Sequence, residues 1–179
     1  MALELHPPGS SFRTPMARED YLALGEAKWH EWYDGLCVVN SPLRRHAVLA
    51  SRLHLLVDGT CPAGFIVVQS WGWETGHGNF IPDLMVVPAE GPNEPWLREP
   101  PLLAVEILSP STRDVDLGRK RELYSAGGLQ CYWVVDPVDA SVSVFTRREH
   151  VLEVAQVIQE RPAESVGPVR ALVDPATLF

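Results

Sequence analysis

The sequence predicts one α/β domain in which a mixed sheet is flanked by helices. Its 179 residues suit a single domain with a substantial core. Hydrophobic residues make up 46% and charged residues 21%, which is typical of a globular protein. Short strand-like apolar runs alternate with helical patterns, as a mixed α/β sheet requires. We therefore treat residues 1–179 as one domain and expect residues 1–13 to form a loose N-terminal segment.

The first third of the chain predicts a short helix, a hairpin and a longer helix. A helix is expected over residues 14–22, because Pro15 suits the first helical position. The runs 28–33 and 36–40 flank Asp34-Gly35, which is a strong signal for a β-hairpin. Over residues 45–57, apolar side chains recur at helical spacing and predict an amphipathic helix.

The rest of the chain predicts strands and one more helix. The expected elements are strands over residues 65–69, 84–87, 102–108 and 131–135, a helix over 114–126, and a final hairpin of strands 142–146 and 151–158. The run 102–108 is nearly all apolar, which is typical of a strand buried on both faces. Gly127-Gly128 is expected to end the helix. The aromatic pairs Trp71/Trp73 and Tyr132-Trp133 either stack on nucleic-acid bases or pack in a core or dimer face.

Composition restricts the location and the kind of binding site. No apolar run reaches the roughly 18 residues of a membrane span, and residues 1–15 lack the pattern of a signal peptide, so we expect a cytoplasmic protein without membrane contact. The cysteines form no CxxC pair, which disfavours a zinc site or a disulfide framework. They are Cys37, Cys61 and Cys131.

The net charge of −8 argues against a protein that coats nucleic acid by bulk charge. It allows an enzyme that binds a phosphate locally through a metal ion. Short basic clusters are either solvated faces or nucleic-acid contacts. They are Arg44-Arg45, Arg119-Lys120-Arg121 and Arg147-Arg148.

Two acidic residues occupy positions where a structural role is hard to assign. Glu106 interrupts the apolar run 102–108, and Asp83 follows Pro82 at the start of another apolar run. A lone carboxylate in a buried strand is costly unless it is paired or bound to a metal. If the two strands are neighbours, both carboxyls can point to one face and attract a divalent cation. The alternative is that Glu106 forms a salt bridge and Asp83 caps a turn.

A lysine projects from the apolar face of the helix predicted over residues 114–126. At about 100° per residue, one arc of that helix carries Leu117, Lys120, Leu123 and Tyr124. A lysine that faces the core needs an anionic partner, and Glu106 on the preceding strand is the obvious candidate. Alternatively, Lys120 extends past the helix edge to solvent.

Two further polar residues are candidates for supporting roles. His46 lies within the apolar stripe of its helix, where it is either a satisfied core residue or a ligand. Glu31 shares a strand face with Trp29 and Tyr33 just before the hairpin turn. An exposed strand glutamate is the alternative interpretation of Glu31.

Several short motifs follow one another in a characteristic order. They are Glu31 with Tyr33-Asp34-Gly35, Ser41-Pro42 with His46, Ile81-Pro82-Asp83-Leu84, the block 105–112 (Val-Glu-Ile-Leu-Ser-Pro-Ser-Thr), Asp116, Lys120, Tyr124, and the block 132–137 (Tyr-Trp-Val-Val-Asp-Pro). This arrangement resembles the PD-(D/E)XK nuclease superfamily and, more narrowly, the Uma-two family of bacterial endonucleases. The resemblance extends from about residue 18 to residue 147. Its most specific part is the block 105–112 with the lysine downstream and the block that begins Tyr132-Trp133.

The resemblance implies a restriction-endonuclease-like fold and a metal site. Asp83, Glu106 and the backbone carbonyl of Ile107 would bind Mg²⁺ or Mn²⁺ through oxygen ligands. Glu31 would complete the metal shell or support a second ion. His46 would lie behind the ligands or contact a phosphate.

The resemblance also assigns a role to Lys120. The superfamily has a lysine two residues after the acid, where this chain has Leu108. The implied explanation is a migrated lysine supplied by the following helix. Lys120 would then orient the attacking water or stabilise the developing oxyanion.

The expected activity is that of a metal-dependent endonuclease that hydrolyses phosphodiester bonds of DNA. The main alternative is a catalytically inactive binding or scaffold protein with the same fold, which Leu108 and the acidic charge favour. A hydrolase of another phosphate ester is a third possibility, since a fold does not fix a substrate. We also expect a homodimer, because a strand-rich domain of this size has sheet edges to protect.

Overall fold

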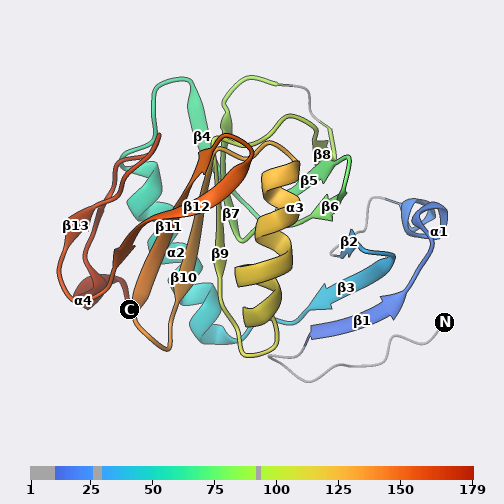
Figure 1. Cartoon of the computed structure of the whole chain (residues 1–179), viewed down its shortest axis with the longest axis horizontal. Helices are drawn as coiled ribbons and strands as arrows, with labels where there is room; N and C mark the ends of the chain where they lie inside the picture. The colour runs from blue at the N-terminus through green and yellow to red at the C-terminus, as the bar shows by residue number, and fades with distance from the viewer. Residues whose placement is uncertain (1–10, 26–29, 92–93) are drawn as a thin grey trace.

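The computed structural model describes residues 11–25, 30–91 and 94–179 and places them in two six-stranded sheets with helices between and beside them (Figure 1). The first sheet has the order β1-β3-β2-β6-β5-β8. Its strands are β1 (Ser11–Pro15), β2 (Glu31–Tyr33), β3 (Leu36–Asn40), β5 (Gly72–Thr75), β6 (Gly78–Phe80) and β8 (Trp96–Leu97). The first helix, α1 (Arg18–Ala23), follows β1.

The second sheet is mixed and has the order β12-β11-β10-β9-β7-β4. Its strands are β4 (Phe65–Gln69), β7 (Leu84–Pro88), β9 (Leu103–Ile107), β10 (Cys131–Asp136), β11 (Ser141–Arg148) and β12 (Val151–Ile158). β9 runs parallel to β10 and antiparallel to β7, as the predicted mixed sheet requires. The remaining elements are α2 (Arg44–Asp58), the π-helical turn η1 (Val115–Lys120), α3 (Arg121–Ala126), the pair β13 (Ala163–Glu164) and β14 (Leu172–Val173), and α4 (Pro175–Leu178).

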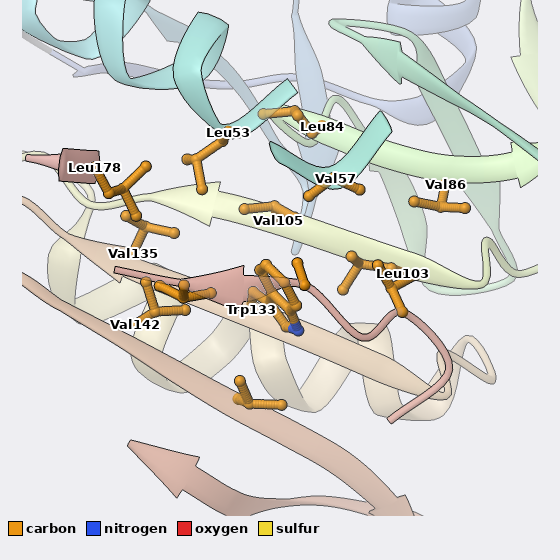
Figure 2. Close-up of a cluster of buried hydrophobic side chains, with 14 of the residues drawn as sticks. Leu53, Val57, Leu84, Val86, Leu103, Val105, Trp133, Val135, Val142 and Leu178 are labelled. Carbon is orange, nitrogen blue, oxygen red and sulfur yellow. The ribbon is translucent and has the colours of Figure 1, made fainter. Parts of the chain in front are cut away.

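The second sheet is buried on both faces, which explains its continuous apolar runs. On one face, Leu53 and Val57 of α2 pack against alternate residues of β7, β9 and β10, such as Val105 and Trp133 (Figure 2). On the other face, the intervening residues pack against α3 and the first sheet. Successive residues along β7 and β9 point to opposite faces of the sheet, so they enter different layers of the core.

Most elements follow the sequence predictions. The strands and helices expected between residues 36 and 158 form at nearly the predicted bounds, and the hairpin 31–40 turns at Asp34-Gly35. Both turn residues have positive φ, 52° for Asp34 and 73° for Gly35, which is the geometry of a type I′ hairpin turn. The part of the predicted strand at residues 28–29 lies outside the described residues.

The N-terminal prediction is wrong in part. Residues 11–13 are not loose, because they pair with β3 through contacts such as Phe12 with Val39. The same strand includes Thr14 and Pro15, so the following helix begins at Arg18. Strand pairing here outweighs the local preference of Pro15 for a helix start, and an edge strand tolerates the missing N–H of proline. Residues 1–10 lie outside the described residues.

Several short strands were not predicted from the sequence. β5, β6, β8, β13 and β14 have two to four residues each, which is too short for a periodic pattern. Trp73 lies on β5. It is fully buried in the core, as are Tyr132 and Trp133, so these three side chains do not form a base-stacking surface. No described helix has the length and apolarity that a membrane crossing needs. All three cysteines are free thiols, as expected.

Candidate active site

The register of β7 and β9 brings the two unusual acids together. Leu84 pairs with Val105 at the end of this antiparallel ladder. Asp83 precedes the first residue of that pair and Glu106 follows the second, so the two acids lie on adjacent strands and, by alternation, on one face. The carboxylate of Asp83 also accepts a 2.7 Å hydrogen bond from the backbone N–H of Ile107.

The ammonium of Lys120 lies between two buried carboxylates. Its Nζ is 2.8 Å from Glu31 Oε1 and 2.9 Å from Glu106 Oε1. Lys120, Glu31 and Glu106 expose only 3%, 3% and 4% of their surface. The predicted Lys120–Glu106 pair is therefore present, and the alternative of a lysine that extends to solvent does not apply.

Glu31 reaches this site because the β2–β3 hairpin places it on the inner face of the first sheet. The backbone N–H of Ile81 donates a 3.0 Å hydrogen bond to Glu31 Oε1, the same atom that Lys120 contacts. The side-chain amide of Asn40 approaches Glu31 Oε2 at 3.5 Å. The alternative of an exposed strand glutamate does not apply, because Glu31 is buried and lines the pocket.

Glu106 also accepts a 2.6 Å hydrogen bond from the hydroxyl of Tyr124. Burial raises the pKa of Glu106 well above its ordinary value, Lys120 opposes that rise, and the neighbouring acid Asp116 adds to it. Burial likewise raises the pKa of Tyr124, with the charge of Glu106 adding to the effect. Tyr124 therefore acts as a neutral hydrogen-bond donor to the carboxylate.

The π-helical turn supplies an acid, Asp116, that the sequence analysis placed in the motif series but to which it gave no role in the site. Asp116 is 2% exposed, and its Oδ1 lies 3.6 Å from Lys120 Nζ. An i→i+5 turn is wider than an α-helical turn, so the 100° spacing used for the predicted arc does not apply to η1. Asp116 takes the inward place predicted for Leu117, which is only half-buried. The i, i+4 spacing of Asp116 and Lys120 was the available signal.

His46 connects α2 to the acid pair. Its Nε2 lies 3.0 Å from Asp83 Oδ2, and the two side chains expose 19% and 21% of their surface. Burial lowers the pKa of His46, but the hydrogen bond and charge of Asp83 outweigh burial and raise it overall. His46 is therefore a partner of Asp83, and the interpretation as an ordinary core histidine is not supported by this contact.

One pocket of about 380 Å³ is lined by the acids, the lysine and the histidine of this site. Its lining includes every residue that the sequence singled out, together with Asp116. These residues are Glu31, His46, Asp83, Glu106, Ile107 and Lys120. They come from both sheets, from η1 and from the N-terminal end of α2.

The charges in the pocket are unbalanced in favour of a cation. Four carboxyl groups, those of Glu31, Asp83, Glu106 and Asp116, line the pocket beside the buried ammonium of Lys120. The other basic groups of the lining lie nearer its surface: Arg45 is exposed, and His46 is paired with Asp83. Burial of several acids around one ammonium is unfavourable, and a divalent cation with hard oxygen ligands offsets the excess. Carboxylate oxygens of this kind are the type of donor that suits a hard divalent cation.

The ligand shell is not already assembled around a metal position. Within residues 11–25, 30–91 and 94–179, no three His, Cys, Asp or Glu side chains are grouped closely enough to hold an ion. Asp83 Oδ2 accepts hydrogen bonds from the chain, and Glu106 Oε1 accepts them from Lys120 and Tyr124. These donors compete with a cation for the same oxygens.

An ion pair outside the pocket fixes the two segments that carry Glu31 and Lys120. Arg119 binds the carboxylate of Asp34 in the hairpin turn with two contacts, Nε to Oδ2 at 2.8 Å and Nη2 to Oδ1 at 2.6 Å. It also contacts Glu122 at 3.1 Å. Arg119 is therefore engaged with acids of the same chain, which disfavours its own interpretation as a phosphate contact.

Leu108 occupies the position two residues after Glu106, where the superfamily has a lysine. It is 5% exposed and belongs to the core cluster of Tyr124 and Trp73. Leu108 also lines the pocket, and Lys120 reaches Glu106 from the helix side.

A mixed sheet with paired acids on neighbouring strands and a lysine beside them defines a restriction-endonuclease-like protein. The chain belongs to the Uma2 family, whose family model, described as "Putative restriction endonuclease", matches residues 18–172. No curated protein matches the chain. Among solved structures, the chain is similar to "a putative nuclease belonging to DUF820" from Anabaena variabilis ATCC 29413, with 19% identity and a TM-score of 0.73. The alignment covers 92% of this chain and 98% of that chain, and it confirms the predicted fold.

We expect Asp116→Asn to stabilise the protein at neutral pH in the presence of EDTA. Burial raises the pKa of Asp116 from 3.8 to about 6, against the opposing effects of Lys120 and a hydrogen bond with Thr112. The folded protein therefore binds this proton more tightly than the unfolded chain, so the associated stability is present below about pH 4 and lost as the pH rises through about 6. Urea denaturation at pH 7 should show a gain of about 1–3 kcal/mol.

The exposed acid Asp58 at the end of α2 provides the matched control, and Asp58→Asn should leave the unfolding free energy nearly unchanged. The Asp116 variant should also show a weaker dependence of stability on pH between about 4 and 6. If Asp116→Asn instead destabilises the protein at pH 7, the carboxylate acts mainly as a partner of Lys120.

Proposed function

We propose that the protein is a Mg²⁺- or Mn²⁺-dependent endonuclease that hydrolyses phosphodiester bonds of DNA. The observation that carries the proposal is the convergence of three carboxyl groups, those of Glu31, Glu106 and Asp116, on Lys120 in the pocket that Asp83 also lines. Membership of the Uma2 family supports a nuclease function in general. The similar fold of the Anabaena protein, which is described as a nuclease, is consistent with it.

Asp83, Glu106 and the backbone carbonyl of Ile107 are the proposed metal ligands. All three residues line the pocket, and oxygen donors of this kind suit Mg²⁺ and Mn²⁺. When bound, the ion lowers the pKa of a coordinated water and offsets charge on the scissile phosphate. Glu31 and Asp116 add negative charge beside these ligands and hold Lys120 in place.

Lys120 is suited to stabilise negative charge and not to remove a proton. Burial lowers its pKa, but Glu106 and Glu31 outweigh burial and raise it well above its ordinary value. An ammonium has three donors, and the contacts with Glu31 and Glu106 occupy two of them. Asp116 at 3.6 Å lies beyond ordinary hydrogen-bond distance, so the third N–H is available to a phosphate oxygen or a water.

His46 holds Asp83 and lies nearer the pocket entrance than Lys120, because its side chain is 19% exposed. A protonated imidazole at this position donates to Asp83 and contributes a positive charge to an incoming phosphate. Its role is therefore to orient Asp83 and to assist substrate binding.

The second candidate is a nuclease-fold binding or scaffold protein without catalytic activity. Leu108 and the engagement of Lys120 by two carboxylates favour this candidate. A protein of this kind has no need to bind a divalent cation at Asp83 and Glu106, so metal binding separates the two candidates.

Calorimetry should detect one tight Mn²⁺ site in the wild-type protein that is lost in Asp83→Ala and weakened in Glu106→Gln. Each change removes a proposed oxygen ligand from the pocket. Asp58→Ala removes an exposed acid at the far end of α2 and should leave the affinity unchanged. Equal Mn²⁺ affinity in all four proteins would exclude the proposed ligands.

Lys120→Met should reduce Mn²⁺-dependent DNA cleavage by about 10²-fold or more, the size expected when a donor to transition-state charge is removed. Methionine keeps buried volume at this position. The loss of the ammonium leaves Glu31 and Glu106 unpaired, so unfolding should become easier by about 3–5 kcal/mol. Thermal melts in Mn²⁺ establish that the variant is folded at the assay temperature.

Arg121→Met is the matched control for the catalytic test. Arg121 neighbours Lys120 in sequence, but its guanidinium lies 5.4 Å from the centre of the Phe145 ring and outside the pocket. Cleavage should therefore be unchanged in Arg121→Met. Undiminished cleavage in folded Lys120→Met would show that the lysine has no catalytic role.

The homodimer also remains a proposal, and the edge of the second sheet supports it. β12 is the last strand in the sheet order and exposes Val151, Val154 and Val157, each by more than half. Exposed apolar edge strands favour pairing with another chain. Light scattering should give the mass of two chains, and Val154→Lys should shift it toward one chain. A single-chain mass for the wild type at high concentration would contradict the dimer.

A further inference from the structure

The groups proposed to act on the phosphate lie at the bottom of the pocket. The side chains of Glu106, Asp116 and Lys120 expose 6%, 3% and 4% of their surface, whereas those of Asp83 and His46 expose 21% and 19%. A phosphate oxygen must come within about 3 Å of Lys120 to accept a hydrogen bond. The scissile phosphate therefore has to enter the pocket instead of resting on the protein surface.

The pocket is too narrow for the body of a double helix. Its volume is about 380 Å³, near the lower end for pockets that bind small ligands. A sphere of that volume is about 9 Å across, which leaves no room for the two paired strands of a duplex side by side. The space matches a segment of about one nucleotide with its phosphate.

The lining of the pocket also differs from a duplex-binding surface. Its upper part carries neutral polar side chains, among them Asn40, Ser41, Ser70 and Ser109. Among the described lining residues the arginine and lysine side chains are Arg45, which is exposed, and Lys120, which is paired with carboxylates. Proteins that grip a duplex neutralise many phosphates with Lys and Arg, and the chain as a whole has a net charge of −8.

We infer that the substrate is single-stranded DNA, or an unpaired segment of DNA, from which one nucleotide enters the pocket. This inference rests on the proposed nuclease function and names its substrate class. An unpaired strand can turn a nucleotide away from its neighbours at low cost, whereas a duplex must first lose base pairing and stacking. Neutral hydroxyl and amide groups at the entrance suit contacts with the phosphate, sugar and base edges of such a nucleotide.

The test compares three DNA substrates of one sequence in Mn²⁺: a labelled single strand, the blunt perfect duplex, and the duplex with a single-stranded tail. The single strand should be cleaved with a kcat/KM at least tenfold above that of the blunt duplex. Cuts in the tailed duplex should fall within the tail. Equal or faster cleavage of the blunt duplex would overturn the inference while leaving the nuclease proposal intact.

Binding provides a second readout that does not depend on cleavage. Fluorescence anisotropy with the same oligonucleotides in Ca²⁺ should show tighter binding of the single strand than of the duplex. The logarithm of the affinity should fall with the logarithm of salt concentration with a slope of about −2 or shallower, since about three phosphate contacts contribute roughly 0.7 each. If no substrate is cleaved, the nuclease proposal fails. If the duplex binds as tightly as the single strand, the inference of a single-stranded substrate is overturned separately.

A variant that fills the entrance tests whether the pocket is the binding site. Ser41 lines the pocket, so Ser41→Trp should weaken single-strand binding at least tenfold and leave Mn²⁺ binding unchanged. Thr60 is exposed just beyond the opposite end of α2, and Thr60→Trp serves as the matched control. Single-strand binding that is equal in both variants and the wild type would overturn the inference.

Discussion

The contact on which the site depends is the buried ammonium of Lys120 between the carboxylates of Glu31 and Glu106. Its two short distances, 2.8 and 2.9 Å, join the first sheet to the second sheet through a residue of the π-helical turn. A single buried cation is therefore shared by three parts of the chain that are distant in sequence. Loss of any partner leaves an uncompensated charge in a region that excludes water, so the arrangement is sensitive to each of its members.

The surrounding structure keeps this arrangement in place. The Ile81 amide fixes Glu31, the Tyr124 hydroxyl fixes Glu106, and the ion pair of Arg119 with Asp34 connects the hairpin to the turn. Even with these contacts, four carboxyls exceed the charge of one lysine. Buried acids with raised pKa values are typical of functional sites, where the excess is useful once a cation or a reacting group enters. The same excess of negative charge supports binding of a divalent ion in the pocket. It also disfavours a surface that binds nucleic acid by bulk positive charge.

Much of the site was predictable because the key residues break local patterns. Glu106 interrupts a buried strand, and Lys120 interrupts an apolar helical face, so burial required that they be paired. Asp116 belongs to the motif series, but its inward position was not predicted, because the turn that carries it is π-helical and α-helical spacing assigned that place to Leu117. The helix start at Pro15 was wrong because pairing of β1 with β3 is a long-range contact that local propensity does not include. The smallest strands, such as β8 at Trp96–Leu97, leave no periodic signal at all.

The most direct test of the central claim is a crystal structure of the protein grown with Mn²⁺ and measured at a wavelength where manganese scatters anomalously. If the proposed metal site is correct, a single strong anomalous peak should appear beside Asp83 and Glu106. Its oxygen ligands should include the carbonyl of Ile107 at about 2.0–2.6 Å. Lys120 should remain in contact with Glu31 at the edge of that ion's shell. If no peak appears in the pocket at saturating Mn²⁺, or if the peak is bound only by surface residues, the proposed metal site is wrong.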